Sequence, residues 1–302
     1  MKKRILALGL TVVLAAASLA ACGGASTKTT EKVTEAAAEK GSEKATEAAK
    51  EEKADAGELR TYKLGVNGSD HEEWEKANEL LAKDNIKVEM VEFSDYVKPN
   101  EALEDGEIDL NAFQTEIYFN NFVKERGYTD LGILAYTQVA PMGIYSSKYK
   151  SLDEATGHLI IAIPNDVTNG GRALKFLEKN GFLTLKKEAG LTPTVMDIEK
   201  YNKDVEIVEM VATQIPASLP DLSFACINNG VAKDAGLTLK NDAIVYEDYK
   251  EPDMKNYWNI IAAKKDRIES EDFQKIKKAY NSDEVKQVVL EHYDGQSIPV
   301  WD

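Results

Sequence analysis

The sequence predicts an α/β protein, and three observations support that class. After the first 57 residues, short apolar runs alternate with amphipathic segments, which is the pattern of strands separated by helices. Residues 159–163 are apolar throughout, as expected of a strand that is covered on both faces. The remaining chain of about 245 residues suits one large or two modest domains, and it shows no long internal repeat.

The expected elements alternate along this region. Strands are expected where short apolar runs are rich in β-branched and aromatic residues. These runs span 62–66, 86–93, 108–113, 159–163, 205–210, 222–227 and 257–263. Helices are expected where apolar residues recur every three or four positions. These segments span 71–83, 98–104, 115–126, 169–180, 271–280 and 283–293. Such alternation favours largely parallel sheets.

Residues 1–21 have the features of a lipoprotein signal peptide. Three basic residues at 2–4 precede an apolar stretch at 5–17, which is shorter than a transmembrane helix. Leu-Ala-Ala at 19–21 then precedes Cys22, so a lipobox is expected, with diacylglycerol on the Cys22 thiol. An ordinary cleaved signal with a chance Cys is the alternative. Lipid on Cys22 would hold the mature protein at the extracytoplasmic face of the cell membrane.

Residues 22–57 are expected to form a tether behind this anchor. Beyond Cys22 they consist almost entirely of Ala, Glu, Lys, Thr, Ser and Gly, and they contain no aromatic residue. Such a segment buries too little apolar area to offset the entropy of ordering. A helix is the competing interpretation, but Glu recurs every fourth position from Glu31 to Glu47 and would stack like charges on one face. We expect a flexible or partly helical spacer.

Composition argues against several functions. The net charge of −15 and the lack of a basic stripe argue against a nucleic-acid partner. His71, His158 and His292 show no metal-ligand spacing, and the segment at 71–74 is expected to be a solvated first helical turn. No nucleophile elbow or Walker loop is present, so no catalytic residue, metal or cofactor is expected. Cys226 lies in an apolar run and is expected to be a buried small hydrophobe.

The stretch from Asn169 to Arg172 is the strongest candidate for ligand binding. It follows the buried run at 159–163, and ligands of open α/β sheets bind beyond the carboxyl ends of strands. Thr168 or Asn169 is expected to cap the next helix, and the two glycines at 170–171 would let a ligand approach the backbone. Arg172 would then lie in the first helical turn, where a cation is unfavourable unless it grips a ligand carboxylate. A solvent-facing Arg paired with an acidic residue is the alternative.

Two further groups of residues follow strand-like segments at loop positions. The aromatic group consists of Phe93, Tyr96, Phe113 and Tyr118. Its rings could close over a flexible side chain such as a thioether, although core packing is the more common outcome of such spacing. Asn228 and Asn229 end another strand, and amides both donate and accept, as a ligand's amino and carboxylate groups require. A turn signal is the alternative there.

Ordered motifs run through nearly the whole chain from Lys63 to Trp301. They are Val-Glu-Phe-Ser-Asp-Tyr-Val at 91–97, Pro-Asn-Glu-Ala-Leu at 99–103, Asp-Leu-Asn-Ala-Phe-Gln at 109–114, Pro-Met-Gly-Ile-Tyr-Ser at 141–146, Ser-Leu-Asp-Glu at 151–154, Ala-Ile-Pro-Asn-Asp-Val-Thr-Asn-Gly-Gly-Arg-Ala-Leu at 162–174, Ala-Tyr-Asn-Ser-Asp-Glu-Val at 279–285 and Val-Trp at 300–301. In these motifs the sequence resembles the NlpA-type lipoproteins, whose best-known members are methionine-binding proteins of ABC importers.

The resemblance implies an α/β fold of the two-lobed periplasmic-binding-protein type (type II), with the ligand in the cleft between the lobes. Lobe 1 is expected at 58–145 plus 247–302, and lobe 2 at 146–246. The chain would cross between the lobes near Ser146 and again near Tyr246.

The resemblance also implies roles for individual residues. Arg172 should hold the substrate carboxylate. The residues that should meet the ligand's amino and carboxylate groups are Asn169, Asn228 and Asn259. Those that should line the side-chain pocket are Tyr96, Phe113 and Tyr118, with Phe93, Gln114 and Thr115 as further candidates. Thr115 stands where the family usually has His, and Gly230 lies where an aromatic residue is common.

The function implied is that of a membrane-anchored binding component that delivers L-methionine, or a related amino acid, to an ABC permease and its ATPase. This is not an enzymatic role. Three alternatives remain: another amino acid, a methionine-containing dipeptide, or a surface lipoprotein with an adhesion or signalling role.

Overall fold

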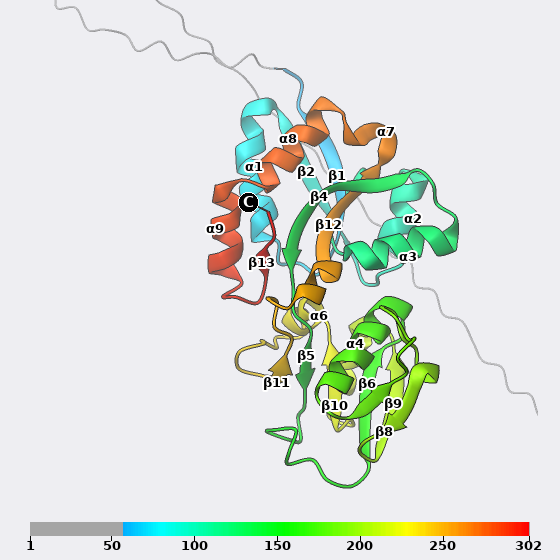
Figure 1. The fold of residues 1–302 in the computed structure, drawn as a ribbon. Helices are drawn as coiled ribbons and strands as arrows, with labels where there is room; N and C mark the ends of the chain where they lie inside the picture. Colours follow the sequence, from blue (N-terminus) through cyan, green and yellow to red (C-terminus); the bar gives the residue numbers. More distant parts are fainter. Residues whose placement is uncertain (1–56, 302) are drawn as a thin grey trace, which may run out of the picture. The chain divides into compact units, whose positions relative to one another are not determined.

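Two β-sheets organise the part of the chain that the structure, a computed structural model, describes: residues 57–301 (Figure 1). These residues belong to one compact unit. The expected signal peptide, Cys22 and all of the expected tether except Gly57 lie outside the described residues.

Lobe 1 is built on a six-stranded sheet in the order β13-β4-β12-β3-β1-β2. Its strands are β1 (Arg60–Asn67), β2 (Ile86–Phe93), β3 (Leu110–Asn111), β4 (Leu131–Val139), β12 (Trp258–Lys264) and β13 (Ile298–Pro299). β1 is parallel to β2 and β3, whereas β12 is antiparallel to β3 and β4. Because β1, β2 and β3 are parallel, their carboxyl ends lie at one edge of the sheet.

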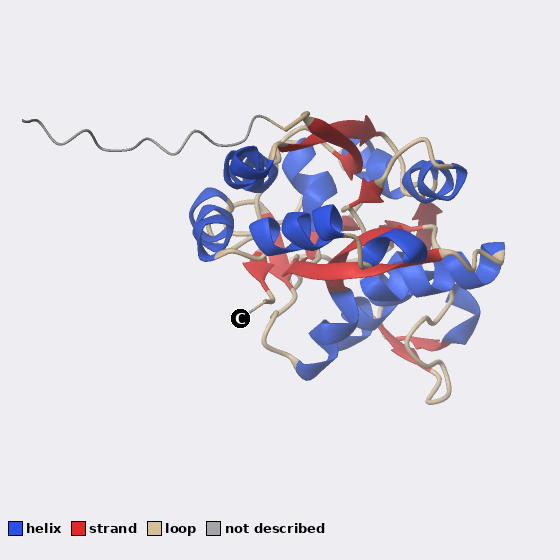
Figure 2. Ribbon diagram, turned by 90° about the horizontal axis from the view of Figure 1, so that it is seen from above, coloured by secondary structure: helices blue, strands red, loops and turns tan. Residues whose placement is uncertain are grey.

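Helices cover both faces of this sheet, as the view in Figure 2 shows. They are α1 (Glu72–Leu81), α2 (Lys98–Asp105), α3 (Glu116–Arg126), α7 (Lys265–Ile268), α8 (Glu271–Tyr280) and α9 (Asp283–His292), with 3-10 turns η1 (Ala82–Asp84) and η4 (Pro252–Tyr257). Helices α1, α8 and α9 pack on a core around Trp74, Phe273 and Tyr280. Helices α2 and α3 pack on a second core that includes Leu103 and Phe119.

Lobe 2 is built on a five-stranded sheet in the order β11-β5-β10-β6-β9. Its strands are β5 (Gly143–Tyr145), β6 (Leu159–Pro164), β9 (Val205–Met210), β10 (Phe224–Ile227) and β11 (Ala243–Tyr246), and β7 (Leu183–Leu185) pairs separately with β8 (Ile198–Tyr201). Its helices are α4 (Val167–Lys179), α5 (Ile215–Ser218) and α6 (Asn229–Asp234), with 3-10 turns η2 (Val195–Asp197) and η3 (Ala212–Gln214). β6 is parallel to both β9 and β10, as its apolar sequence predicted.

Two crossover segments connect the lobes, one after β4 and one after β11. Strand β5 pairs with β10 and β11, so sheet membership places the first crossing before Gly143, slightly earlier than Ser146. Strand β11 ends at Tyr246, and the chain returns to lobe 1 through η4. We propose residues 143–246 as lobe 2.

The expected start of α4 is wrong. Asp166, rather than Thr168 or Asn169, is the N-cap, and its carboxylate accepts the Asn169 backbone N–H at 2.8 Å. The helix therefore begins at Val167, and Arg172 lies in its second turn rather than its first. The dipole argument for Arg172 thus loses most of its force, because the field of a helix terminus falls off within one turn.

The two glycines of the same motif serve packing rather than ligand approach. A Cβ atom at Gly170 would lie 2.6 Å from the carbonyl oxygen of Pro164, and one at Gly171 would lie 2.8 Å from the Cα atom of Thr192. Neither glycine lines the cavity described below. Their role is to let α4 pack closely within lobe 2.

Candidate ligand-binding cleft

A cavity of about 1020 Å³ is lined by residues of both lobes. Lobe 1 contributes the loops that follow β1, β2 and β3, and lobe 2 contributes the starts of α4 and α6. All ten residues that the sequence proposed for substrate binding line it. They are Phe93, Tyr96, Phe113, Gln114, Thr115, Tyr118, Asn169, Arg172, Asn228 and Asn259. The structure therefore brings together side chains that are spread over 167 sequence positions, from 93 to 259.

Three aromatic rings form a wall on the lobe 1 side. Tyr96 and Phe113 follow β2 and β3, and Tyr118 lies in the first turn of α3. Their ring centroids are 6.0 to 6.3 Å apart, and the Tyr118 hydroxyl donates to the Tyr96 carbonyl at 3.0 Å. Burial raises the pKa of both tyrosines well above its ordinary value, so both hydroxyls stay neutral. The wall is apolar and uncharged.

Thr115 has a structural role beside this wall. Its hydroxyl is the N-cap of α3 and accepts the Tyr118 backbone N–H at 3.3 Å. An isolated bridge pairs Thr115 with Asn259 of β12. The Asn259 side chain itself makes no hydrogen bond to the described residues, so its amide is available to a ligand.

Gln114 is a weaker candidate than the sequence suggested. Its side chain is 3 % exposed, and its amide is joined to those of Asn100 and Asn111 through three hydrogen bonds of 2.7 to 2.8 Å. These bonds use both of its N–H donors and its carbonyl oxygen. We infer that Gln114 fixes the loop carrying Phe113 and Thr115, and that its side chain does not bind ligand directly.

Arg172 is buried and already has a carboxylate partner. Its side chain is 3 % exposed, and its Nε donates to both oxygens of Glu247 at 3.0 and 3.1 Å. Its Nη2 donates to Glu247 and to the Ala140 carbonyl, and the guanidinium lies 4.3 Å from the centroid of the Tyr257 ring. The alternative of an Arg paired with an acidic residue is thus partly realised, although the pair is buried rather than solvent-facing. The Nη1 group has no hydrogen-bond partner among the described residues.

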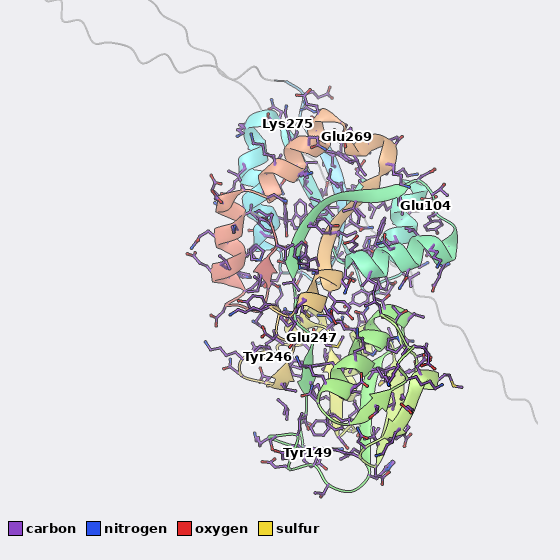
Figure 3. All side chains as sticks on the ribbon, viewed as in Figure 1. Glu104, Tyr149, Tyr246, Glu247, Glu269 and Lys275 are labelled. Carbon is purple, nitrogen blue, oxygen red and sulfur yellow. The ribbon has the colours of Figure 1, made fainter. Side chains whose placement is uncertain are left out.

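Sequence reasoning missed Glu247, which lies at the junction of the lobes (Figure 3). It follows β11 in the second crossover and also accepts the backbone N–H of Met142, in the first crossover, at 2.7 Å. One carboxylate therefore ties both crossovers to α4 through Arg172. No signal in the sequence marked it, since Arg172 and Glu247 are 75 positions apart.

A second polar cluster that sequence reasoning also missed lines the cavity. Lys233 of α6 pairs with the Asp70 carboxylate at 3.2 Å and lies 4.1 Å from the centroid of the Tyr293 ring. The Tyr293 hydroxyl donates to Glu73. The segment at 71–74 is therefore not a solvated turn: Glu73 is 4 % and Trp74 1 % exposed.

Among residues 57–301, no group of three or more His, Cys, Asp or Glu residues is placed to hold a metal ion. Likewise, none of the helices described there is long and apolar enough to cross a membrane.

The two lobes and the cleft between them are those of a substrate-binding protein of the type II periplasmic fold, a class that binds its ligand without converting it. The sequence matches the NlpA lipoprotein family over residues 62–301, and the chain belongs to that family. The predicted fold and family are both confirmed.

Individual relatives carry more specific names. The D-methionine-binding lipoprotein MetQ of Escherichia coli (strain K12) is 40% identical over 243 residues, which are 79% of this chain and 88% of the relative. The substrate-binding protein of a methionine transporter from Streptococcus pneumoniae has a TM-score of 0.75 at 37% identity, covering 80% of this chain and 96% of its own. A nutrient-binding protein from Burkholderia cenocepacia bound to methionine has a TM-score of 0.75 at 35% identity, covering 80% and 100%.

Proposed function

We propose that this protein is the substrate-binding component of an ABC importer and that its cargo is L-methionine or a close relative. One observation carries the proposal: an uncharged aromatic wall and the polar side chains of Arg172, Asn228 and Asn259 line the same cavity. Relatives at about 40% identity are named as methionine-binding lipoproteins, which supports the same cargo. An adhesion or signalling role would not require this pairing.

The aromatic wall suits the methionine side chain. A thioether is flexible and polarisable, and it is attracted to the edges of aromatic rings at separations of about 5 Å. The rings of Tyr96, Phe113 and Tyr118 pack against one another at centroid distances of 6.0 to 6.3 Å, so an unbranched side chain can lie against the surface that they present to the cavity. A charged side chain would lose its hydration there without gaining a partner.

The polar side chains of the site suit the α-carboxylate and α-ammonium groups. Glu247 occupies the Nε and Nη2 edge of Arg172, which leaves Nη1 as the donor that meets the ligand carboxylate. Arg172 is therefore expected to bind the ligand carboxylate through Nη1 alone rather than through two nitrogens of its guanidinium. The amides of Asn228 and Asn259 complete the polar contacts with the two charged groups.

A methionyl dipeptide is the second candidate, and the size of the cavity favours it. The cavity continues from the aromatic wall to Asp70 and Tyr293, so it has room beyond one amino acid. Water can also fill the part of the cavity that a single amino acid would leave empty, and its free-energy cost is small where polar groups line that part.

Calorimetric titration tests the proposal. The chain is stripped of bound ligand by unfolding and refolding, then titrated with the twenty amino acids and with methionyl dipeptides. We expect saturable binding of L-methionine, stronger than that of the other nineteen. Strong binding of another amino acid would overturn the cargo but keep the transport role, whereas no binding at all would overturn both.

A lipid anchor at Cys22 completes the proposal. Family members are lipoproteins, and the Leu-Ala-Ala-Cys motif ending at Cys22 is the expected lipidation site. Replacing Cys22 with Ser should move the protein from the membrane fraction to the soluble fraction after cell disruption. Retention in the membrane fraction at wild-type levels would contradict lipidation at Cys22.

A further inference from the structure

Two amides of the cleft lie together because their strands are parallel neighbours. Strand β6 leads to α4 and Asn169, and β10 leads directly to Asn228. The carboxyl ends of parallel strands share one edge of the sheet, and here this brings the two side chains into hydrogen-bond contact. The Nδ2 atom of Asn228 donates to the Oδ1 atom of Asn169 at 2.8 Å.

Asp166 fixes the direction of this bond. Its carboxylate accepts the Asn169 backbone N–H at 2.8 Å and the Asn169 side-chain Nδ2 at 3.0 Å to each oxygen. An ionised carboxylate only accepts, so Asn169 must turn its NH₂ group toward Asp166 and its carbonyl oxygen toward Asn228. Asn228 must then donate to Asn169, and its own carbonyl oxygen is left over.

The carbonyl oxygen of Asn228 is the last acceptor in this series of hydrogen bonds. The Oδ1 atom of Asn228 is buried and has no hydrogen-bond partner among the described residues, although Asn228 lines the cavity. A buried acceptor without a donor is unfavourable, so a group that brings an N–H to this position is favoured there. The α-ammonium group of an amino acid is such a donor, whereas its carboxylate is not.

The charge of Asp166 points the same way. It makes no ion pair with any described residue, and it does not line the cavity. Asp166 therefore acts on a ligand in two ways: through the hydrogen bonds of Asn169 and Asn228, and through the electrostatic field of its negative charge. Both favour a cationic group at the end of the chain.

We propose that Asp166 is a positioning residue for the cargo: through Asn169 it fixes Asn228 with its carbonyl oxygen toward the ligand's ammonium group. This inference rests on the proposed function, because it needs a cargo with an α-ammonium group. It assigns to Asp166 a role beyond capping α4, since the N-cap alone would be served by Asn or Ser.

The primary test is Asp166→Asn in the full chain, purified in detergent and stripped of ligand. Asn still caps α4, but its NH₂ group now faces Asn169 and favours the reversed direction of both amides. The titrants are L-methionine and 4-(methylthio)butanoate, which lacks only the amino group. Affinity for methionine should fall at least about tenfold, because a bond to a charged group is lost. Affinity for the analogue should change less than about twofold.

A matched control separates orientation from the general loss of a charge. Asp197 of the same lobe also accepts a local backbone N–H and side chain, from Thr194, at 2.8 and 2.9 Å. It does not line the cavity, so Asp197→Asn should leave both affinities unchanged.

Relocating the charge gives a second test. In Asp166→Asn/Asn228→Asp, the reversed amide of Asn169 donates to the new carboxylate at position 228, whose second oxygen faces the ammonium group. In Asn228→Asp alone, Asn169 lies between two carboxylates and cannot satisfy both. The double variant should therefore bind methionine at least about tenfold more tightly than Asp166→Asn.

The outcomes separate the inference from the proposed function. If wild-type protein does not bind methionine, the proposed function fails. If wild-type binds but Asp166→Asn binds equally well, or loses methionine and the amino-free analogue to the same extent, the positioning role of Asp166 is wrong. A double variant weaker than both single variants would also overturn it.

Discussion

Two ion-paired clusters border the cleft, and they differ in how much they depend on the two lobes meeting. In the first, Arg172 and Glu247 are 3 % and 11 % exposed at the side chain, and they join α4 to both crossovers. In the second, Lys233 and Asp70 are 25 % and 40 % exposed and join α6 of lobe 2 to the loop after β1 of lobe 1.

The lower exposure of the Arg172 cluster indicates a role in stabilising the fold, whereas the more exposed Lys233 pair is expected to respond to ligand. The Arg172 cluster lies where the chain crosses between the lobes, so we expect it to persist when the angle between them changes. The Lys233 pair joins α6 of lobe 2 to the loop after β1 of lobe 1, so we expect it to stabilise the arrangement in which the two lobes meet. Two-lobed binding proteins close by hinge motion around their ligands, which the Lys233 pair would favour.

The largest effect is expected when the buried pair is broken. Glu247→Ala leaves the guanidinium of Arg172 buried without a counter-charge, which should lower the free energy of unfolding by about 3 to 5 kcal/mol. Urea denaturation measures this. Glu251→Ala is the control, because it breaks an exposed pair with Lys179 and should cost about 1 kcal/mol or less. Equal losses in the two variants would remove the distinction between buried and exposed pairs.

Arg172→Ala addresses binding rather than folding. Removing the ligand's cationic partner should weaken methionine binding by about 2 to 5 kcal/mol. This variant also leaves the Glu247 carboxylate buried without its partner. It is therefore compared with Arg172→Met/Glu247→Met, which removes both charges and should recover stability but not affinity. A fall in affinity of less than about threefold in either variant would show that Arg172 does not meet the carboxylate.

A smaller effect is expected at the exposed pair. Lys233→Met keeps the length and apolar body of the side chain but removes its charge. Stability should change by about 1 kcal/mol or less, while methionine should dissociate up to about fivefold faster because the closed state is less favoured. Stopped-flow fluorescence measures the dissociation rate. An unchanged rate at low salt would show that this pair does not hold the cleft closed.

The smallest effect is expected for the reactivity of the Cys226 thiol, which reports on the packing of lobe 2. It is fully buried in β10, and burial, followed by the charge of Glu247, raises the pKa of its thiol. The wild-type protein should resist iodoacetamide at neutral pH until it is unfolded. Labelling should stay slow in Lys233→Met and become faster in Glu247→Ala. Rapid labelling of native wild-type protein would contradict the packing of lobe 2.

The sequence predicted elements with strong periodicity closely and missed what depends on distant partners. The strand at 86–93 and the helix at 271–280 match β2 and α8 at both ends, because their apolar patterns are uninterrupted. The start of α4 was misplaced because Asp166, Thr168 and Asn169 are all good caps, and only the fold decides among them.

The site shows the same division. Its predicted residues do line one cavity, because the family motifs mark the ends of parallel strands. The partner of Arg172 could not be foreseen, since Glu247 sits 75 positions away and follows an unremarkable exposed strand end. Lys233 and Asp70 are separated by 163 positions, and their pairing depends on the approach of two lobes.

The central claim is that the cleft recognises both charged groups of an amino acid together with a thioether side chain. The most direct test is calorimetric titration of the ligand-stripped protein with L-methionine, with methioninamide, which lacks the carboxylate, and with 4-(methylthio)butanoate, which lacks the amino group. Each analogue should bind at least about tenfold more weakly than L-methionine, because each leaves polar groups of the cleft without a partner. Equal affinity for all three, or no binding of L-methionine, would contradict the account.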